Sequence, residues 1–156
     1  MTSDMQSEVM EILHEAKRLA QRYRHATGKP LGITGEVAEY EAARILGLKL
    51  TPARQAGYDA IEERHGTLHR LQIKGRCILP NCKPGQRLGS IDIEQDFDSV
   101  LLVLLNENFD ATAIYEADRQ NVLAALSTPG SKARNERGAL GVVKFKAIGR
   151  LRWQAE

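Results

Sequence analysis

The feature that most constrains this 156-residue chain is an unbroken apolar run at residues 100–105, Val-Leu-Leu-Val-Leu-Leu. A strand that is apolar at every position, rather than at alternate positions, is typical of a strand buried on both faces of its sheet. The run is much too short for a helix that spans a bilayer, which takes about 20 apolar residues. We therefore expect residues 100–106 to form a buried strand and expect no membrane association.

The rest of the pattern predicts one α/β domain. Apolar residues recur at helical spacing early in the chain, and the period changes to two after residue 52, where Gly66 lies in a short turn that joins two strands into a β-hairpin. The predicted helices are residues 3–25, residues 35–46 with Thr34 as N-cap, and a short segment from Asp118 to about residue 126. The predicted strands are residues 58–63, 68–79, 100–106 and 111–116. The tail, residues 142–153, fits either a helix or a strand. This order predicts a mixed sheet of about four strands flanked by helices.

The composition indicates a class of protein and a cellular location. With 22 basic and 20 acidic residues, 42% hydrophobic content and 27% charged content, the chain has the composition of an ordinary globular domain. Acidic residues occupy the N-terminal positions where a secretion signal would be basic, and two cysteines are no disulfide framework, so a cytoplasmic protein is expected. No Gly-x-Gly-x-x-Gly or Walker-type loop occurs, so no nucleotide cofactor is expected.

The net charge of +2 hides a segregation along the chain. Residues 1–87 carry 14 basic and 10 acidic side chains, residues 88–128 carry one and eight, and residues 129–156 carry seven and two. Basic segments of this kind suit a phosphate-bearing partner. They also occur on solvated surfaces with uneven charge, and the charge pattern by itself favours that plainer interpretation.

The second predicted strand of the hairpin, residues 68–79, has polar side chains on one face. Alternation places four polar side chains together there: Arg70, Gln72, Lys74 and Arg76. The solvent side of an antiparallel hairpin has the same pattern. However, Asp59 lies on the neighbouring strand, thirteen residues before Gln72, and Glu36 lies in the first turn of the second predicted helix.

This set of residues resembles the PD-(D/E)xK nuclease superfamily, which has the restriction-endonuclease-like fold. The resemblance rests on Glu36, on Gly57-Tyr58-Asp59 and on Leu71-Gln72-Ile73-Lys74. It is nearest to the Mrr-like branch, in which Gln replaces the acidic residue of the core motif. The whole chain also looks like a bacterial domain family with no assigned function. We therefore expect a single domain over residues 1–156, with an N-terminal helix (1–30), a nuclease-like core (31–127) and a basic C-terminal extension (128–156).

The resemblance implies a metal-dependent DNA endonuclease of the restriction, defence or repair kind, with Mg²⁺ or Mn²⁺ as cofactor. Asp59 would be the central metal ligand, joined by the side-chain oxygen of Gln72, the backbone carbonyl of Ile73 and, directly or through water, Glu36. Lys74 would orient the attacking water and stabilise charge developing on the phosphate. Because Gln72 brings an oxygen without a charge, the alternative is a catalytically silent module of this fold that binds nucleic acid or a partner protein. In a third interpretation, Asp59 and Lys74 merely pair with each other.

The basic residues expected to contact DNA lie on the hairpin, in the loop 80–89 and near the C-terminus. They are Arg70, Arg76, Lys83, Arg87, Lys132, Arg134, Arg137, Lys144 and Lys146. We expect the loop and residues 132–152 to flank the face of Lys74 as one basic groove, with the acidic segment 88–128 elsewhere. A solvated C-terminal face is the alternative. The N-terminal helix has enough apolar surface for core packing or for a homodimer contact.

Other residues with chemical potential favour plainer roles. Glu39, Glu62 and Glu63 are expected on solvent-exposed surfaces. Four residues invite a zinc interpretation: His65, His69, Cys77 and Cys82. Their spacings are H-x₃-H and C-x₄-C, instead of the short paired spacing typical of structural zinc sites, so zinc is not expected.

Overall fold

The apolar run forms the strand β4 (Ser99–Leu105), and all seven of its residues are buried. The computed structural model describes residues 2–52, 57–127 and 140–156. Alternate residues of β4 enter two separate cores: Leu101, Val103 and Leu105 face one, and Val100, Leu102 and Leu104 face the other. The run lacks polar positions because neither face of the strand meets water.

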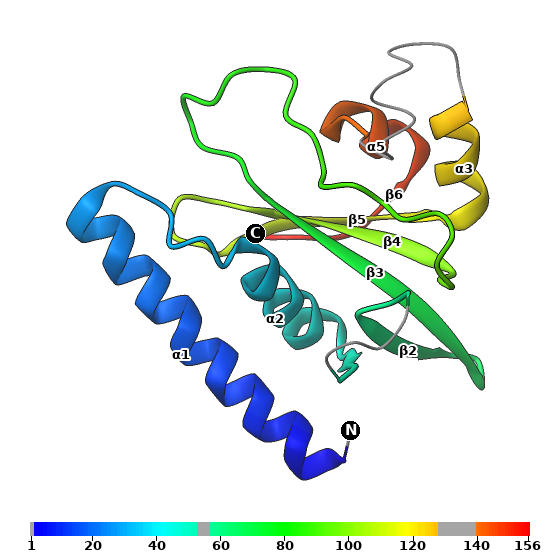
Figure 1. Ribbon diagram of the computed structural model, residues 1–156, viewed down its shortest axis with the longest axis horizontal. Helices are drawn as coiled ribbons and strands as arrows, with labels where there is room; N and C mark the ends of the chain where they lie inside the picture. Colours follow the sequence, from blue (N-terminus) through cyan, green and yellow to red (C-terminus); the bar gives the residue numbers. More distant parts are fainter. Residues whose placement is uncertain (1, 53–56, 128–139) are drawn as a thin grey trace.

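The described residues form one mixed sheet of six strands, in the order β1-β2-β3-β4-β5-β6 (Figure 1). The other strands are β1 (Lys49–Leu50), β2 (Ala60–Arg64), β3 (Thr67–Cys77), β5 (Ala111–Asp118) and β6 (Arg150–Gln154). β3 and β4 run parallel, and every other neighbouring pair is antiparallel. A parallel pair needs a long connection, which residues 78–98 supply. This connection contributes Leu88, Ile91 and Phe97 to the second core.

Helices cover both faces of the sheet. α1 (Ser3–Thr27) and α2 (Thr34–Leu46) lie on one face, and α3 (Arg119–Ser127) and α5 (Val142–Ile148) lie on the other (Figure 1). α2 approaches β3 closely at Gly75, where a Cβ atom would lie 2.5 Å from the Cβ of Ala38. The missing side chain therefore lets the first half of α2 rest directly on β3. None of the described helices has the length and apolar character needed to cross a membrane.

The structure confirms the α/β class and the predicted hairpin, whose turn at His65 and Gly66 has positive φ at both residues. The prediction of about four strands was too low, because β1 and β6 extend the sheet at its two edges. The ambiguous tail contains both elements, α5 followed by β6. Gly149 separates them, and a Cβ there would lie 2.6 Å from the carbonyl oxygen of Glu116. Thr34 is the first residue of α2 rather than its N-cap, a position that Ile33 occupies.

Candidate functional site

The centre of the candidate site is the place where β2 stops pairing with β3. The backbone N–H of Asp59 donates to the carbonyl of Leu71 at 2.8 Å, just beyond the last paired residues of β2 and β3, Ala60 and Leu71. The next N–H of β3 on this edge, that of Ile73, donates instead to Oδ2 of the Asp59 side chain at 2.7 Å. The N–H and C=O of a strand residue point to the same edge, so the carbonyl of Ile73 also faces Asp59.

A second carboxylate approaches this edge from α2. Glu39 is half-buried, and its pKa is raised to about 7, first by burial and then by the negative charges of Asp59 and Glu36. The structure thus brings Glu36, Glu39 and Asp59 into one electrostatic neighbourhood. The expectation of a solvent-exposed Glu39 was wrong, because the close approach of α2 to β3 at Gly75 carries this part of the helix inward.

The Gln72 and Lys74 side chains leave β3 on the face opposite α2. Leu71 and Ile73 pack in the core beneath α2, and strand alternation sends Gln72 and Lys74 the other way. Gln72 is only 7% exposed. The ammonium of Lys74 donates to the backbone carbonyl of Ser90, in the β3–β4 connection, at 2.8 Å. Asp59 therefore lies at the strand edge between the carboxylates of α2 and the two polar side chains of β3.

The oxygen donors at this edge suit a hard cation better than a soft one. Asp59 binds the N–H of Ile73 through one of its two carboxylate oxygens, and Glu39 and the carbonyl of Ile73 add further oxygens. In the described residues, no group of three His, Cys, Asp or Glu side chains is placed to hold a metal ion. Mg²⁺ needs less than that, because it usually keeps several waters and binds through one or two carboxylates together with substrate phosphates. The described residues offer no complete protein cage for a cation at this edge.

The zinc interpretation gains no support from the fold. Its four candidate residues form no metal-binding group among the described residues. His69 instead lies 2.9 Å from the hydroxyl of Ser99, through its Nε2 atom. Cys77 packs against the core beneath α2, as a small apolar residue would.

The basic residues predicted to contact DNA differ in their exposure and in their bonds to other residues. Arg70 is held by Asp98, whose carboxylate lies 3.2 Å from Nε of Arg70 and also accepts from its backbone N–H at 2.7 Å. The hydrogen bond from Arg70 is the largest cause of the lowered pKa of Asp98. The Nε of Arg76 is buried and has no hydrogen-bond partner in the described structure. Lys83, Lys144 and Lys146 are exposed.

Two further members of this basic set, Arg87 and Lys146, make local contacts. Arg87 is half-buried, and its backbone bridges to Gly141. Lys146 lies above the ring of Tyr115, with its ammonium 5.4 Å from the ring centroid. The predictions for Lys132, Arg134 and Arg137 fall outside the described residues.

The loop 80–89 and residues 140–142 lie together, on the face of Lys74. The N–H of Leu88 donates to the carbonyl of Leu140 at 2.9 Å, and the N–H of Val142 donates to the carbonyl of Gln86 at 2.8 Å. The expectation that the acidic segment 88–128 lies elsewhere was wrong. That segment supplies both Asp98, which pairs with Arg70, and Ser90, which binds Lys74.

The end of the C-terminal segment takes part in an ion-pair cluster instead of a groove. Arg152 bonds to Glu62 at 2.8 Å and to Glu116 at 2.6 Å, and Arg64 bonds to the same two carboxylates. Burial alone would raise the pKa of Glu116, but the hydrogen bonds from Arg64 and Arg152 outweigh burial and lower it to about 2. Glu62, expected at the surface, is therefore a member of a partly buried network.

Sequence reasoning missed two participants, Glu39 and Ser90. Glu39 was detectable in principle, because it lies three residues after Glu36 and hence on a nearby face of the same helix. Ser90 contributes only a backbone carbonyl, for which no residue-type signal exists. Comparison of the chain with protein-family models finds no match, and comparison with curated proteins also finds none.

Proposed function

We propose that the protein is a metal-dependent nuclease with a restriction-endonuclease-like core that hydrolyses DNA phosphodiester bonds. One observation carries the proposal: the Asp59 carboxylate caps the N–H of Ile73, the residue between Gln72 and Lys74, at 2.7 Å. This contact ties the two separate parts of the predicted motif together at a strand edge. The raised pKa of Glu39, caused in part by the charges of Asp59 and Glu36, adds support.

The residues that would hold the cation are Asp59, the side-chain oxygen of Gln72 and the carbonyl of Ile73, with Glu36 and Glu39 close by on α2. When bound, a divalent cation supplies charge neutralisation at the phosphate and a more acidic water. The backbone N–H of Ile73 binds one oxygen of Asp59, so the Asp59 carboxylate is held in a fixed position. Without a cation the pKa of Glu39 is about 7, and a cation bound beside it would lower this pKa by favouring the carboxylate.

Lys74 would supply positive charge where negative charge develops on the phosphate. In the structure its ammonium is bound to the carbonyl of Ser90, a neutral acceptor that an anionic phosphate oxygen can replace. The exposed Lys83 and Lys144 supply cations for flanking phosphates on the same side of the sheet. Arg70 would have to leave Asp98 before it could make such a contact.

The alternative function is a module of the same fold that binds nucleic acid or a partner protein without cutting. Two observations favour it: Gln72 carries no charge, and the carboxylates of the described residues form no group of three placed for a metal ion. Binding would then rest on the exposed lysines, and its affinity would fall steeply as salt is added.

Plasmid cleavage separates the two functions. Supercoiled DNA is incubated with the wild type, with Asp59→Asn and with Glu63→Gln, in Mg²⁺, in Mn²⁺ and in chelator. Glu63 is an exposed carboxylate on β2 and serves as the matched control. The nuclease proposal predicts nicking by the wild type and by Glu63→Gln only with metal, and none by Asp59→Asn. Salt-dependent binding without cleavage by the wild type would select the alternative.

A further inference from the structure

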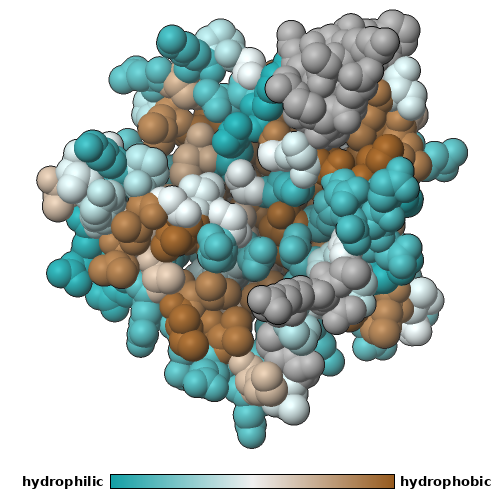
Figure 2. All heavy atoms as spheres, in the orientation of Figure 1, coloured by the Kyte–Doolittle hydropathy of each residue, from teal (hydrophilic) through white to brown (hydrophobic). Residues whose placement is uncertain are grey.

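α1 carries an apolar stripe, four members of which are exposed. Six residues recur along the helix at alternating steps of four and three: Met5, Val9, Ile12, Ala16, Leu19 and Tyr23. Met5, Ile12 and Leu19 are each at least 50% exposed, and Tyr23 is 39% exposed. Figure 2 shows hydrophobic patches along the part of the surface that α1 occupies in Figure 1. Alternation of four and three is the heptad spacing of a helix that packs against another helix.

A different face of α1 holds the helix on the domain. Ala20 is fully buried, and Met10 and Leu13 pack against the core beneath α2, as does the half-buried stripe member Val9. The ammonium of Lys17 bonds to Glu41 at 2.9 Å and to Asp110 at 2.7 Å. The exposed members of the stripe are therefore not needed for attachment of α1 to its own domain.

The exposed charges of α1 are divided between its two halves. The first half carries Asp4, Glu8, Glu11 and Glu15, and the second half carries Arg18 and Arg22, all of them exposed. Like charges follow one another at a spacing of four, as in Glu11 and Glu15 or Arg18 and Arg22, and such pairs repel on a single helix. The helix dipole favours acidic residues only within the first turn, so it accounts for Asp4 and not for the other three.

We propose that the α1 stripe is a homodimer interface, on which α1 of a second copy packs antiparallel about a two-fold axis near residue 14. This register sets Met5 opposite Tyr23 and Ile12 opposite Ala16. It also sets the acidic half of each helix against the basic half of the other. A parallel arrangement would place acid against acid, and a partner with charge of one sign would match only one half. The surface is self-complementary, as a two-fold interface requires.

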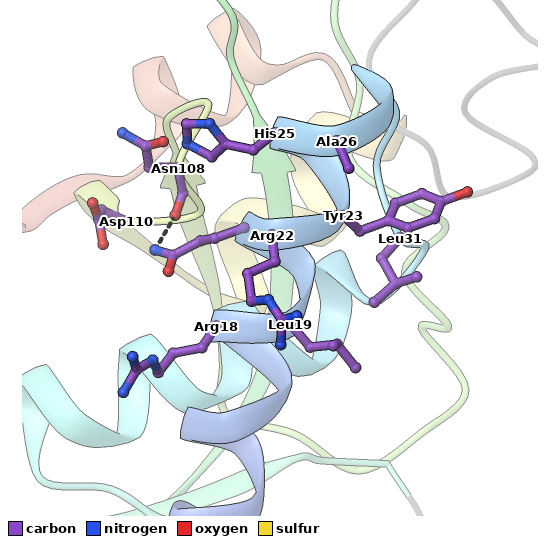
Figure 3. Close-up of a pocket in the computed structure, with 10 residues that line it drawn as sticks. Arg18, Leu19, Arg22, Tyr23, His25, Ala26, Leu31, Asn108 and Asp110 are labelled. Atoms are coloured by element: carbon purple, nitrogen blue, oxygen red, sulfur yellow. Dashed lines mark hydrogen bonds between the residues drawn. The ribbon is translucent and has the colours of Figure 1, made fainter.

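The C-terminal end of α1 provides space for this contact. Leu19 and Tyr23 line a hollow of about 1040 Å³ together with Leu31, and Figure 3 shows these three side chains on the same side of the helix. The antiparallel register brings Met5 of the second copy to this end. Methionine is flexible and fills irregular apolar surfaces well. Arg18 and Arg22 border the same hollow, where they meet the acidic first half of the second α1.

The first test measures oligomeric state and does not depend on the proposed nuclease function. Sedimentation velocity of the full chain over a range of concentrations should show a dimer for the wild type and a monomer for Ile12→Glu/Leu19→Glu. Val143→Glu, at a 79% exposed apolar position on α5, is the matched control and should remain dimeric. Far-UV circular dichroism verifies that each variant is folded. A wild type that is monomeric at every concentration, or a double variant that still dimerises, would overturn the proposal.

The second test uses charge reversal to examine the antiparallel register. Glu8→Arg/Glu11→Arg reverses two charges in the acidic half of α1, and Arg18→Glu/Arg22→Glu reverses two charges in the basic half. Each variant alone should lose the dimer because like charges then face each other. An equimolar mixture should regain it as a heterodimer. Dimerisation by either variant alone, or failure of the mixture to associate, would contradict the antiparallel interface.

Discussion

The carboxylate of Asp59 occupies the place of a strand partner for Ile73, whose backbone N–H it accepts at 2.7 Å. Backbone pairing between β2 and β3 ends one step earlier, at the bond from the N–H of Asp59 to the carbonyl of Leu71. The Asp59 side chain thus replaces a backbone partner at the end of the β2–β3 pairing, and it places a carboxylate beside Ile73. This relationship has consequences for stability as well as for chemistry.

We predict that the hydrogen bond to Ile73 matters more for folding than the charge of Asp59 does. Asp59→Asn keeps an oxygen acceptor and should change the free energy of unfolding by less than about 1 kcal/mol. Asp59→Ala leaves the N–H of a buried residue without its partner and should cost about 1–3 kcal/mol. Urea unfolding of both variants measures the difference. Equal losses for Asn and Ala would show that the charge, rather than the hydrogen bond, stabilises this edge.

Glu39 predicts a pH dependence with a definite sign. Its pKa is raised in the folded protein, from an ordinary 4.5 to about 7. Between these values the folded state keeps a proton that the unfolded state has lost, so stability falls as pH rises through this window. Because Glu39 is only partly shielded from water, we expect a total change of about 1–3 kcal/mol.

The variant Glu39→Gln isolates this contribution. It should be more stable than the wild type at pH 8, and its unfolding midpoint should vary less between pH 4.5 and pH 7. Glu63→Gln, at an exposed position, should follow the wild-type profile. If the unfolding midpoint of Glu39→Gln varied with pH as much as that of the wild type, the raised pKa of Glu39 would be wrong.

The contact between α2 and β3 predicts that Gly75→Ala is destabilising. The added Cβ would lie 2.5 Å from the Cβ of Ala38 and 3.2 Å from the carbonyl of Thr34, so α2 must shift outward. Overpacking of this kind typically costs about 1–3 kcal/mol. Gly89→Ala is the control, because a Cβ at Gly89 would meet nothing within 4 Å. Thermal unfolding of the two variants should therefore differ clearly, and equal midpoints would argue against tight packing at Gly75.

The ion-pair cluster around Glu116 predicts a loss of stability in acid. The pKa of Glu116 is lowered from 4.5 to about 2, so its contribution is complete above about pH 4.5 and is lost as pH falls toward 2. Glu116→Gln leaves Arg64 and Arg152 without the charge they bind, at a cost of about 3–5 kcal/mol near neutral pH. Denaturant unfolding at pH 7 and pH 3 should show a smaller difference between variant and wild type at pH 3. A loss that did not change with pH would point to packing instead of charge.

Much of the fold follows from local pattern. The unbroken apolar run marks β4, and the change of period with Gly66 marks the hairpin. β1 has only two residues, too few to produce a periodic signal. The tail satisfied two patterns because α5 and β6 are separated by a single residue, Gly149, and either period can be extended across it.

The sequence predicts the residue types of the candidate site but not their contacts. Asp59, Gln72 and Lys74 are visible as a spaced motif. The partners that modify them come from distant sequence: Asp98 lies 28 residues after Arg70, and Ser90 lies 16 residues after Lys74. The burial of Glu39 depends on how closely α2 approaches β3, which is a tertiary property that helical spacing does not encode.

The most direct test of the central claim is the rate of plasmid cleavage in Mg²⁺ and Mn²⁺ by wild type, Gln72→Glu and Lys74→Ala. The account predicts that the wild type cleaves DNA. It also predicts that Gln72→Glu cleaves at a lower metal concentration, because the variant restores an acidic group at the motif position. It predicts a rate lower by about 10²–10³ for Lys74→Ala, with little change in the metal concentration required. If neither the wild type nor Gln72→Glu cleaves DNA with either metal, the nuclease function is contradicted and the binding function is retained.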